Sequence, residues 1–270
     1  METSSIITIQ TFILNSFYLA RNVTVDVYAH EDLSPENPVS LLLINDGQNL
    51  AEMKFETILD NLYAAGDIRN LICVGIHVGK DRKVEYGTAN VLDYKGRGAK
   101  AEAYGKFLFN ELLPYLKKKL SIHSFKDKSF CGFSLGGLTA LDIVWNHPHE
   151  FHKVGVFSGS LWWRTVDQAD PEFNEEVHRI MHTQVKNGSY HPWLKFFFET
   201  GILDETADRN NNGIIDSIDD TLSLIKELEL KGYELGKDIK YLELHDGRHD
   251  LDTWARAFPV FLKWGWSNEK

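Results

Sequence analysis

The sequence SFCGFSLGGL, residues 129–138, decides the fold. An apolar run enters it, Ser134 stands between glycines, and an apolar, helix-like run covers residues 138–144. This order is typical of a nucleophile elbow, Gly-x-Ser-x-Gly, in which a sharp strand-to-helix turn presents a serine hydroxyl. Side chains at Gly132 or Gly136 would collide with neighbouring backbone where the chain doubles back. We therefore predict that Ser134 is a nucleophile.

The elbow pattern alone is not decisive. It should occur by accident in roughly one chain in ten of this length. A glycine-rich turn that only packs a helix on a sheet is the main alternative. A phosphate-binding loop fits less well, because no Gly-Lys-Ser/Thr ending follows. Cys131 belongs to the incoming strand and is not treated as a nucleophile.

Apolar runs spaced along the chain predict the rest of the fold. Continuous runs at 39–44, 71–76, 154–157, 194–198 and 239–244 suit strands that are covered on both faces. Alternating segments at 6–14 and 22–30 predict an antiparallel hairpin. The clearest helical pattern covers 101–120, and Pro114 should kink it or end its first part. We therefore predict one α/β domain over 1–270, with a mostly parallel central sheet and helices on both faces.

Composition limits the functional classes. A formal net charge of −10 argues against a nucleic-acid or membrane partner. The chain shows no membrane-spanning run and no secretory signal at residues 1–5. Both cysteines, Cys73 and Cys131, lie in apolar runs, as expected of buried, reduced thiols. These features favour a cytoplasmic protein, and they leave the oligomeric state open.

Three segments at predicted strand ends carry the side chains for nucleophilic catalysis. Ser134 follows one strand, Asp204 follows the next, and His249 follows the last. This order, serine then acid then histidine, is the one found in the α/β-hydrolase fold. His249 would be the base and Asp204 would orient it. His245 is the alternative base, and Glu205 and Glu199 are alternative acids.

Ester chemistry on a serine also needs donors for the oxyanion that forms in the tetrahedral intermediate. One donor is expected to be the backbone N–H of Leu135, directly after the nucleophile. The other is expected in the loop after the strand that ends at Ile44, and Gln48 N–H is the best candidate. Asp-Gly is also a common turn pair, so Asp46 and Gly47 could equally mark a simple turn.

The combination of segments resembles the "putative esterase" family of α/β-hydrolases, which includes esterase D and enterochelin-esterase-like enzymes. The resemblance is carried by six segments, at 45–49, 82–86, 111–115, 132–137, 158–163 and 247–254. It implies carboxylic-ester hydrolysis without a cofactor, with Ser134 and His249 as nucleophile and base. It also implies that Arg82, Tyr86, Trp162 and Trp163 line the substrate pocket, although aromatic pairs are more often core residues.

Residues 208–219, DRNNNGIIDSID, match a different pattern. Oxygen-bearing residues fall at positions 1, 3, 5, 9 and 12, with glycine at position 6, as in an EF-hand-type calcium loop. The predicted ligands are Asp208, Asn210, Asn212, the Ile214 carbonyl, Asp216 and Asp219. A polar turn without metal is the alternative. We expect a structural calcium ion that steadies the loop next to Asp204.

The leading functional prediction is a serine esterase that acts on a small-molecule ester through an acyl-enzyme. An acyltransferase that uses the same residues is one alternative. A non-catalytic binding module stabilised by calcium is another. The sequence does not identify the ester.

Overall fold

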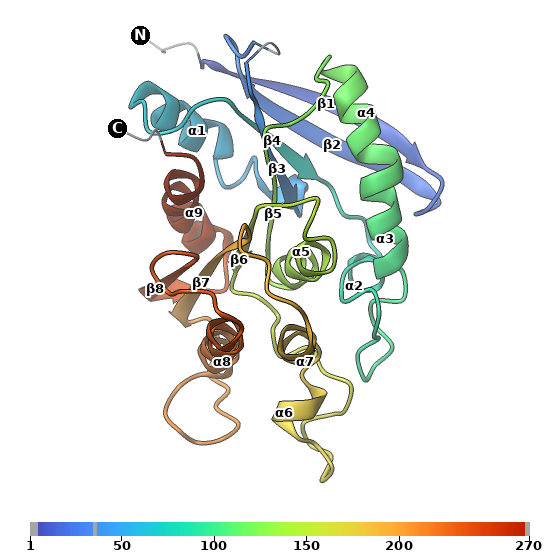
Figure 1. Cartoon of the computed structure of the whole chain (residues 1–270), viewed down its shortest axis with the longest axis vertical. Helices are drawn as coiled ribbons and strands as arrows, with labels where there is room; N and C mark the ends of the chain where they lie inside the picture. Colours follow the sequence, from blue (N-terminus) through green and yellow to red (C-terminus); the bar gives the residue numbers. More distant parts are fainter. Residues whose placement is uncertain (1–4, 35–36, 268–270) are drawn as a thin grey trace.

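The computed structural model describes residues 5–34 and 37–267. Within them, eight strands form one sheet in the order β1-β2-β4-β3-β5-β6-β7-β8 (Figure 1). The strands are β1 Ile7–Ser16, β2 Arg21–His30, β3 Ser40–Asn45, β4 Leu71–Ile76, β5 Lys128–Phe133, β6 Lys153–Phe157, β7 Lys195–Leu203 and β8 Ile239–Arg248. The absence of a secretory signal is a prediction about residues that lie mostly outside this range, at 1–4.

The pairing of the strands confirms the predicted fold class. β1 and β2 form an antiparallel hairpin, and β2 runs antiparallel to β4. From β4 to β8 every neighbouring pair is parallel. The parallel strands therefore begin at one edge of the sheet and end at the other. We call these the amino edge and the carboxyl edge, and the predicted triad belongs to the second.

Helices cover both faces of the sheet (Figure 1). α1 Phe55–Ala64 and α9 Leu251–Trp266 pack on one face, in a core cluster that contains Phe55, Phe258 and Phe261. The other face carries α3 Ala101–Phe107, α4 Leu113–Lys119, α5 Leu135–Asn146, α7 Ile180–Asn187 and α8 Asp216–Lys231. The short α2 Arg82–Glu85, α6 Glu175–His178 and the 3-10 turn Gly47–Asn49 lie in connections. The strands from β3 to β6 are buried by these layers, which explains their continuous apolar runs.

The helix predicted at 101–120 is interrupted. α3 and α4 are joined by a π-helical turn, Leu108–Leu112, and Pro114 is in the first turn of α4. Proline has no N–H to donate to the preceding turn, so the backbone is accommodated by a wider turn just before it. The predicted kink thus takes the form of a π segment.

β7 and β8 are longer than the sequence predicts. β7 continues through Glu199 to Leu203, and β8 continues through His245 to Arg248. Polar residues that look like loop in the sequence are in strands here, because their backbone groups are paired across the two strands. The extension carries Asp204 and His249 beyond the row of the other strand ends.

Two predictions from composition can be compared with the structure. Cys73 and Cys131 are both buried and free, as predicted. None of the helices in the described part of the chain has the length and apolar character needed to cross a membrane.

Candidate active site

Ser134 occupies a nucleophile elbow. β5 ends at Phe133 and α5 begins at Leu135, with Ser134 between them at φ 54° and ψ −122°. A non-glycine residue in this backbone region is strained. A Cβ atom at Gly132 would come within 2.4 Å of the Gly136 carbonyl oxygen, so the turn requires glycine there. The sequence therefore places Ser134 at the tip of a turn at the carboxyl edge.

The hydroxyl of Ser134 lies against a second serine, Ser160. The two Oγ atoms are 3.4 Å apart, and Ser160 N–H donates to the Ser134 carbonyl at 3.1 Å. Ser160 is buried, so its position is fixed. We did not assign Ser160 from the sequence, although the segment 158–163 contains it. From this segment we selected Trp162 and Trp163 instead.

Asp204 and His249 are brought together by strand register. Leu203 of β7 pairs with Arg248 of β8, and Asp204 and His249 are the next residues of these two parallel strands. Neighbouring strands lie about 4.8 Å apart. The approach is unusually close just before this point, because a Cβ atom at Gly201 would lie 2.3 Å from the Gly247 carbonyl carbon. Two glycines therefore allow the acid and the imidazole to come together.

Trp254 connects His249 with the elbow. Its ring packs edge-on against His249, with centroids 5.2 Å apart, and stacks on Phe133 at 5.1 Å. Desolvation is the main cause that lowers the pKa of His249, and Arg82 lowers it further while Asp204 raises it. Arg82 in turn donates to the Phe133 carbonyl at 3.3 Å. Trp254 and Arg82 thus each link His249 with Phe133, the residue that precedes Ser134.

A hydrogen bond between Ser134 and His249 is not formed in this structure. Ser160 is the one hydrogen-bond partner of Ser134 Oγ within residues 5–34 and 37–267. Catalytic hydrogen bonds are often long and tighten only when substrate binds. The structure therefore brings the predicted base to the site but does not show it in contact with the nucleophile.

Two carboxylates lie beside the base. The carboxylate oxygens of Asp204 and Glu199 have no hydrogen-bond partner among the described residues. Desolvation raises the pKa of Glu199 to about 8, and Asp204 contributes to this increase. Desolvation also raises the pKa of Asp204, whereas Ser158 and His249 lower it. The negative charge of Asp204 therefore adds to burial in disfavouring ionisation of Glu199.

Ser158 is a further residue that we did not assign from the sequence. It follows β6 with a positive φ of 44°, and its N–H donates to the Glu199 carbonyl at 2.8 Å. Its Oγ accepts from the Trp254 indole N–H at 2.9 Å. The sidechain of Ser158 thus lies between the carboxylates and the ring that packs on His249.

The alternative triad residues are placed less favourably. Glu199 is fully buried within β7, in the sheet row of Phe157 rather than at the strand end. Glu205 is exposed, and His245 is still inside β8, four residues before His249. Asp204 and His249 are the acid and the histidine that directly follow the paired ends of the two strands.

The expected oxyanion donors both belong to the first turns of helices, Leu135 to α5 and Gln48 to the 3-10 turn. Within the described residues, the N–H groups of Leu135 and Gln48 donate to no other group. The Gln48 turn is held by Asp46, whose carboxylate accepts two bonds from Arg82, at 2.8 and 2.7 Å. Asp46 N–H also donates to Tyr86 Oη at 3.1 Å. The turn before Gln48 is therefore fixed from both sides.

The four predicted pocket residues differ in position. Tyr86 and Trp163 are fully buried in the core, so they support the site from behind and do not fit the prediction of substrate contact. Arg82 is committed to Asp46. Trp162 lines a cavity of about 340 Å³ together with Tyr94, Lys95, Arg97, Arg164, Gln168, Glu205, Ala207 and Asp216.

The loop at 208–219 has part of the geometry expected of a calcium site. Asp208 accepts from the N–H groups of Asn212 and Gly213, at 3.1 and 2.9 Å. Asp219 accepts from the side-chain amides of Asn210 and Asn212, at 2.8 and 3.0 Å. Positions 1, 3, 5 and 12 of the motif therefore converge.

Asp216, at position 9, does not join this group. Its Oδ1 accepts from Arg209 N–H at 2.8 Å, and the Arg209 guanidinium lies 3.3 Å away. The reason is local, because Asp216 begins α8 and Arg209 is held against it by Glu175 and Asp220. No group of three or more His, Cys, Asp or Glu residues in the described ranges is placed to hold a metal ion.

Comparison with known proteins identifies the family. Residues 16–264 match the family described as "Putative esterase". Among solved structures, a ferulic acid esterase is 19% identical with a TM-score of 0.68, and the match covers 96% of this chain and 97% of that one. The enterobactin esterase FES from Shigella flexneri in the presence of enterobactin is 21% identical with a TM-score of 0.72, covering 95% of this chain and 58% of its own. An IroE-like serine hydrolase from Shewanella oneidensis is 18% identical, with a TM-score of 0.69, and 94% and 79% are covered.

The present chain thus spans less than two thirds of the Shigella esterase, and these identities support a common fold. No match is found among curated proteins. The family match extends over most of the sequence and includes the elbow, both strand ends and the Gln48 turn. The chain belongs to the "Putative esterase" family and is an esterase with the α/β-hydrolase fold.

Proposed function

We propose that the esterase hydrolyses its substrate through an acyl-enzyme formed on Ser134, with His249 as base and Asp204 as the residue that orients it. The main support is the register of β7 and β8, which makes Asp204 and His249 adjacent, together with the strained elbow at Ser134. The proposal requires the His249 ring to turn toward Ser134 when substrate binds.

The proposed mechanism assigns each step to a named group. Ser134 Oγ attacks the ester carbonyl carbon while His249 accepts the hydroxyl proton. The N–H groups of Leu135 and Gln48 stabilise the oxyanion, and Asp204 stabilises the imidazolium. His249 then gives the proton to the leaving alcohol, and an acyl-serine remains. Water attacks this ester with His249 as base, which releases the acid and restores the hydroxyl.

A matched pair of serine variants tests the nucleophile. Ser134→Ala should lower kcat/KM for short acyl esters by at least about 10³-fold and abolish labelling by a fluorophosphonate probe. Ser160→Ala makes the same chemical change on the neighbouring hydroxyl and should retain labelling. Labelling of Ser134→Ala at the wild-type rate, in a protein with an unchanged melting curve, would place the nucleophile elsewhere.

The substrate is proposed to carry an aromatic or anionic group. The cavity lined by Trp162 lies close to the proposed site in the sequence. Trp162 is two residues after Ser160, and Glu205, which also lines the cavity, directly follows Asp204. In it, the Arg97 guanidinium lies 5.0 Å from the Trp162 ring and the Arg164 guanidinium lies 5.6 Å from it. Stacked arginines and aromatic rings suit a flat, electron-rich group. A panel of aliphatic and aromatic esters tests this, since equal kcat/KM values for both would contradict it.

We also propose that the loop binds calcium through Asp208, Asn210, Asn212, the Ile214 carbonyl and Asp219. The convergence of these residues supports the proposal, and binding requires the Asn210 and Asn212 amides to rotate so that their oxygens face the ion. Because Asp216 is held by Arg209, we expect weak affinity. Calorimetric titration with Ca²⁺, with Asp219→Asn as the impaired variant, tests it. Absence of binding heat for the wild type would leave the loop as a polar turn.

A further inference from the structure

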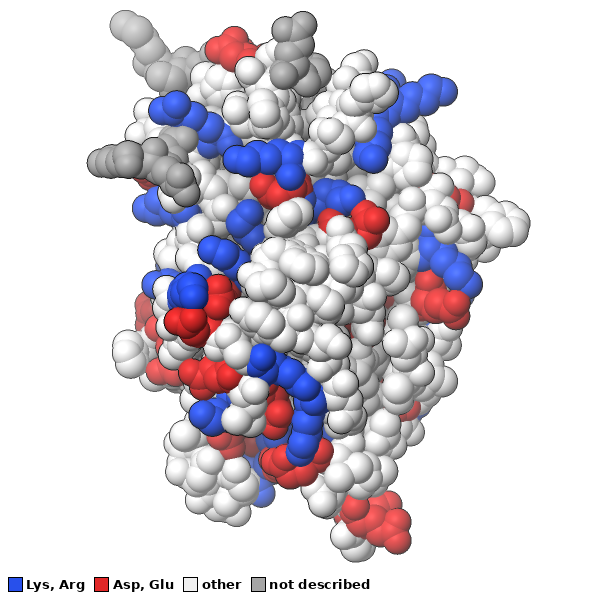
Figure 2. Space-filling view, in the orientation of Figure 1, with Lys and Arg blue, Asp and Glu red and all other residues white. Residues whose placement is uncertain are grey.

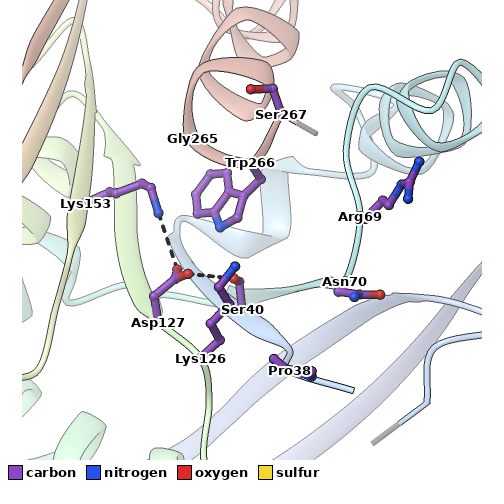
Figure 3. A pocket seen from close by; sticks show the side chains of 10 residues that line it. All are labelled: Pro38, Ser40, Arg69, Asn70, Lys126, Asp127, Lys153, Gly265, Trp266 and Ser267. Carbon is purple, nitrogen blue, oxygen red and sulfur yellow. Dashed lines mark hydrogen bonds and ion pairs between the residues drawn. The ribbon is translucent and has the colours of Figure 1, made fainter. Parts of the chain in front are cut away.

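A second hollow lies at the amino edge of the sheet, on the opposite side of the strands from Ser134. It has a volume of about 420 Å³ and is formed where the parallel strands begin (Figure 3). Ser40 starts β3, Lys153 starts β6, and Asp127 directly precedes β5. The C-terminal end of α9 closes the hollow with Trp266. No residue of the predicted active site lines it.

The lining has an excess of positive charge. Three cations, Arg69, Lys126 and Lys153, line the hollow with one carboxylate, Asp127, and Arg69 lies on the side opposite Asp127 (Figure 3). Asp127 is already shared, because it accepts from Ser40 Oγ at 2.7 Å and lies 3.5 Å from Lys153 Nζ. Within the described ranges, Arg69 and Lys126 have no ion-pair partner at all. Figure 2 shows Lys and Arg side chains gathered beside α1 and α9, although the whole protein carries a charge of −10.

Lys153 is the cation that is held most tightly. It is largely buried, and its Nζ lies 5.0 Å from the centre of the Trp266 ring. Desolvation is the main cause that lowers its pKa, and Lys195 and Lys126 lower it too, while Asp127 raises it. The single contact with Asp127, at 3.5 Å, does not offset the desolvation cost of burying this charge. An additional anion in the hollow would offset more of that cost.

The indole N–H of Trp266 is an independent sign of a missing partner. Trp266 is only 8% exposed, yet its Nε1 has no hydrogen-bond partner among the described residues. Phe261 packs edge-on against the ring at 5.5 Å and holds its orientation. In Figure 3 the ring projects from α9 into the space between Lys153 and Ser40. Buried polar groups are almost always paired, so an unpaired buried donor in a hollow lined by cations is unusual.

We infer that this hollow is a binding site for a phosphate group, either the free ion or the phosphate of a small monoester. Lys153, Lys126 and Arg69 would neutralise a dianion, because they leave two positive charges in excess of Asp127. The Trp266 N–H would donate to one of its oxygens. The volume exceeds that of the phosphate group alone, which leaves room for a small organic substituent. The inference does not depend on Ser134 or on ester hydrolysis.

Calorimetric titration of the full chain with inorganic phosphate and with glycerol 3-phosphate tests the site. We expect saturable binding of one equivalent, weakened at least tenfold in Lys153→Met. Lys226→Met removes the same charge from the exposed surface of α8 and should leave the affinity unchanged. If Lys153→Met does not fold, Arg69→Gln combined with Lys126→Gln changes exposed side chains only and should give the same tenfold loss. Tighter binding of one probe than the other identifies the free ion or the monoester as the better ligand.

Three outcomes would overturn the inference. The first is no saturable binding of either probe. The second is an equal loss of affinity in Lys226→Met, which would mean attraction by overall charge. The third concerns Glu269, which follows Ser267 in the sequence. If a chain that ends at Ser267 binds phosphate and the full chain does not, the cations serve the protein's own tail. Esterase activity should be unchanged in the Lys153 variant, so this test and the Ser134 test fail separately.

Discussion

The two edges of the parallel sheet differ in their unbalanced charges. At the carboxyl edge the Glu199 and Asp204 carboxylates lie beside the predicted base, whereas at the amino edge Lys153, Lys126 and Arg69 outnumber Asp127 around a hollow. Both edges also leave buried polar atoms without partners, the carboxylates of Glu199 and Asp204 at one and the Trp266 N–H at the other. The β-strands satisfy their own backbone groups, but the loops at either end need not. Buried polar atoms without partners, more than the fold itself, therefore indicate where a ligand is expected to bind.

The largest expected effect is the loss of activity when the proposed catalytic base at the carboxyl edge is removed. His249→Ala should reduce kcat/KM by at least about 10³-fold, because the proposed mechanism assigns to this imidazole the transfer of the serine proton. His245→Ala is the matched control, four residues earlier in the exposed part of β8, and should keep most of the activity. Measured ester hydrolysis that falls with His245 instead would reverse the assignment.

The next effect separates the candidate acids. Asp204→Asn keeps the size of the side chain but cannot stabilise the imidazolium, so kcat should fall by roughly 10² to 10⁴-fold with little change in KM. Glu205→Gln makes the equivalent change on the exposed neighbour and should cost far less. Steady-state kinetics on one aryl ester distinguish them. Similar losses in both variants would mean that the carboxylate acts through its general field.

A third effect concerns stability. The pKa of Glu199 is raised to about 8, so the folded protein binds one more proton than the unfolded chain between about pH 4.5 and 8. Stability from this group is therefore full at low pH and is lost as the pH rises toward 8. Glu199→Gln should stabilise the protein at pH 9 by on the order of a few kcal/mol and change little at pH 5. Thermal melts at the two pH values measure this, and a variant equally destabilised at both would contradict it.

The smallest effect is on the pH profile. Because the pKa of His249 is lowered from 6.5, kcat/KM should rise with pH to a plateau whose midpoint lies below that value. Asp250 raises the pKa of His249, and Asp250→Asn, which preserves the N-cap of α9, should move the midpoint down by less than about one pH unit. Asp246→Asn removes a charge that is paired with Arg256 and should not move it.

Much of the carboxyl edge is predictable from sequence because its signals are local. Ser134, Gly132 and the apolar runs around them specify the elbow with a few adjacent residues, and the parallel sheet follows from the continuous runs. Ser160 and Ser158 were not predicted, because their proximity to Ser134 and to the carboxylates depends on a loop that returns across the strand ends. The fully buried positions of Tyr86 and Trp163 likewise depend on packing between distant segments.

The amino edge could not be predicted at all. Arg69, Asp127, Lys153 and Trp266 are separated in the sequence by tens of residues, and each is unremarkable where it stands. Only the register of parallel strands places them around one space. The pairing of Asp216 with Arg209 could not be predicted for a related reason, since it belongs to a network that includes α6 and α8.

The positive φ angles of Ser134 and Ser158, at the ends of two adjacent strands, have an evolutionary consequence. Glycine adopts this backbone region without penalty, and each such serine costs on the order of 1 kcal/mol or more. Selection for thermal tolerance alone would therefore replace Ser134, and a laboratory lineage screened only by heat challenge should accumulate glycine there and lose turnover. Ser158 should persist, because glycine would leave the buried Trp254 N–H without its acceptor.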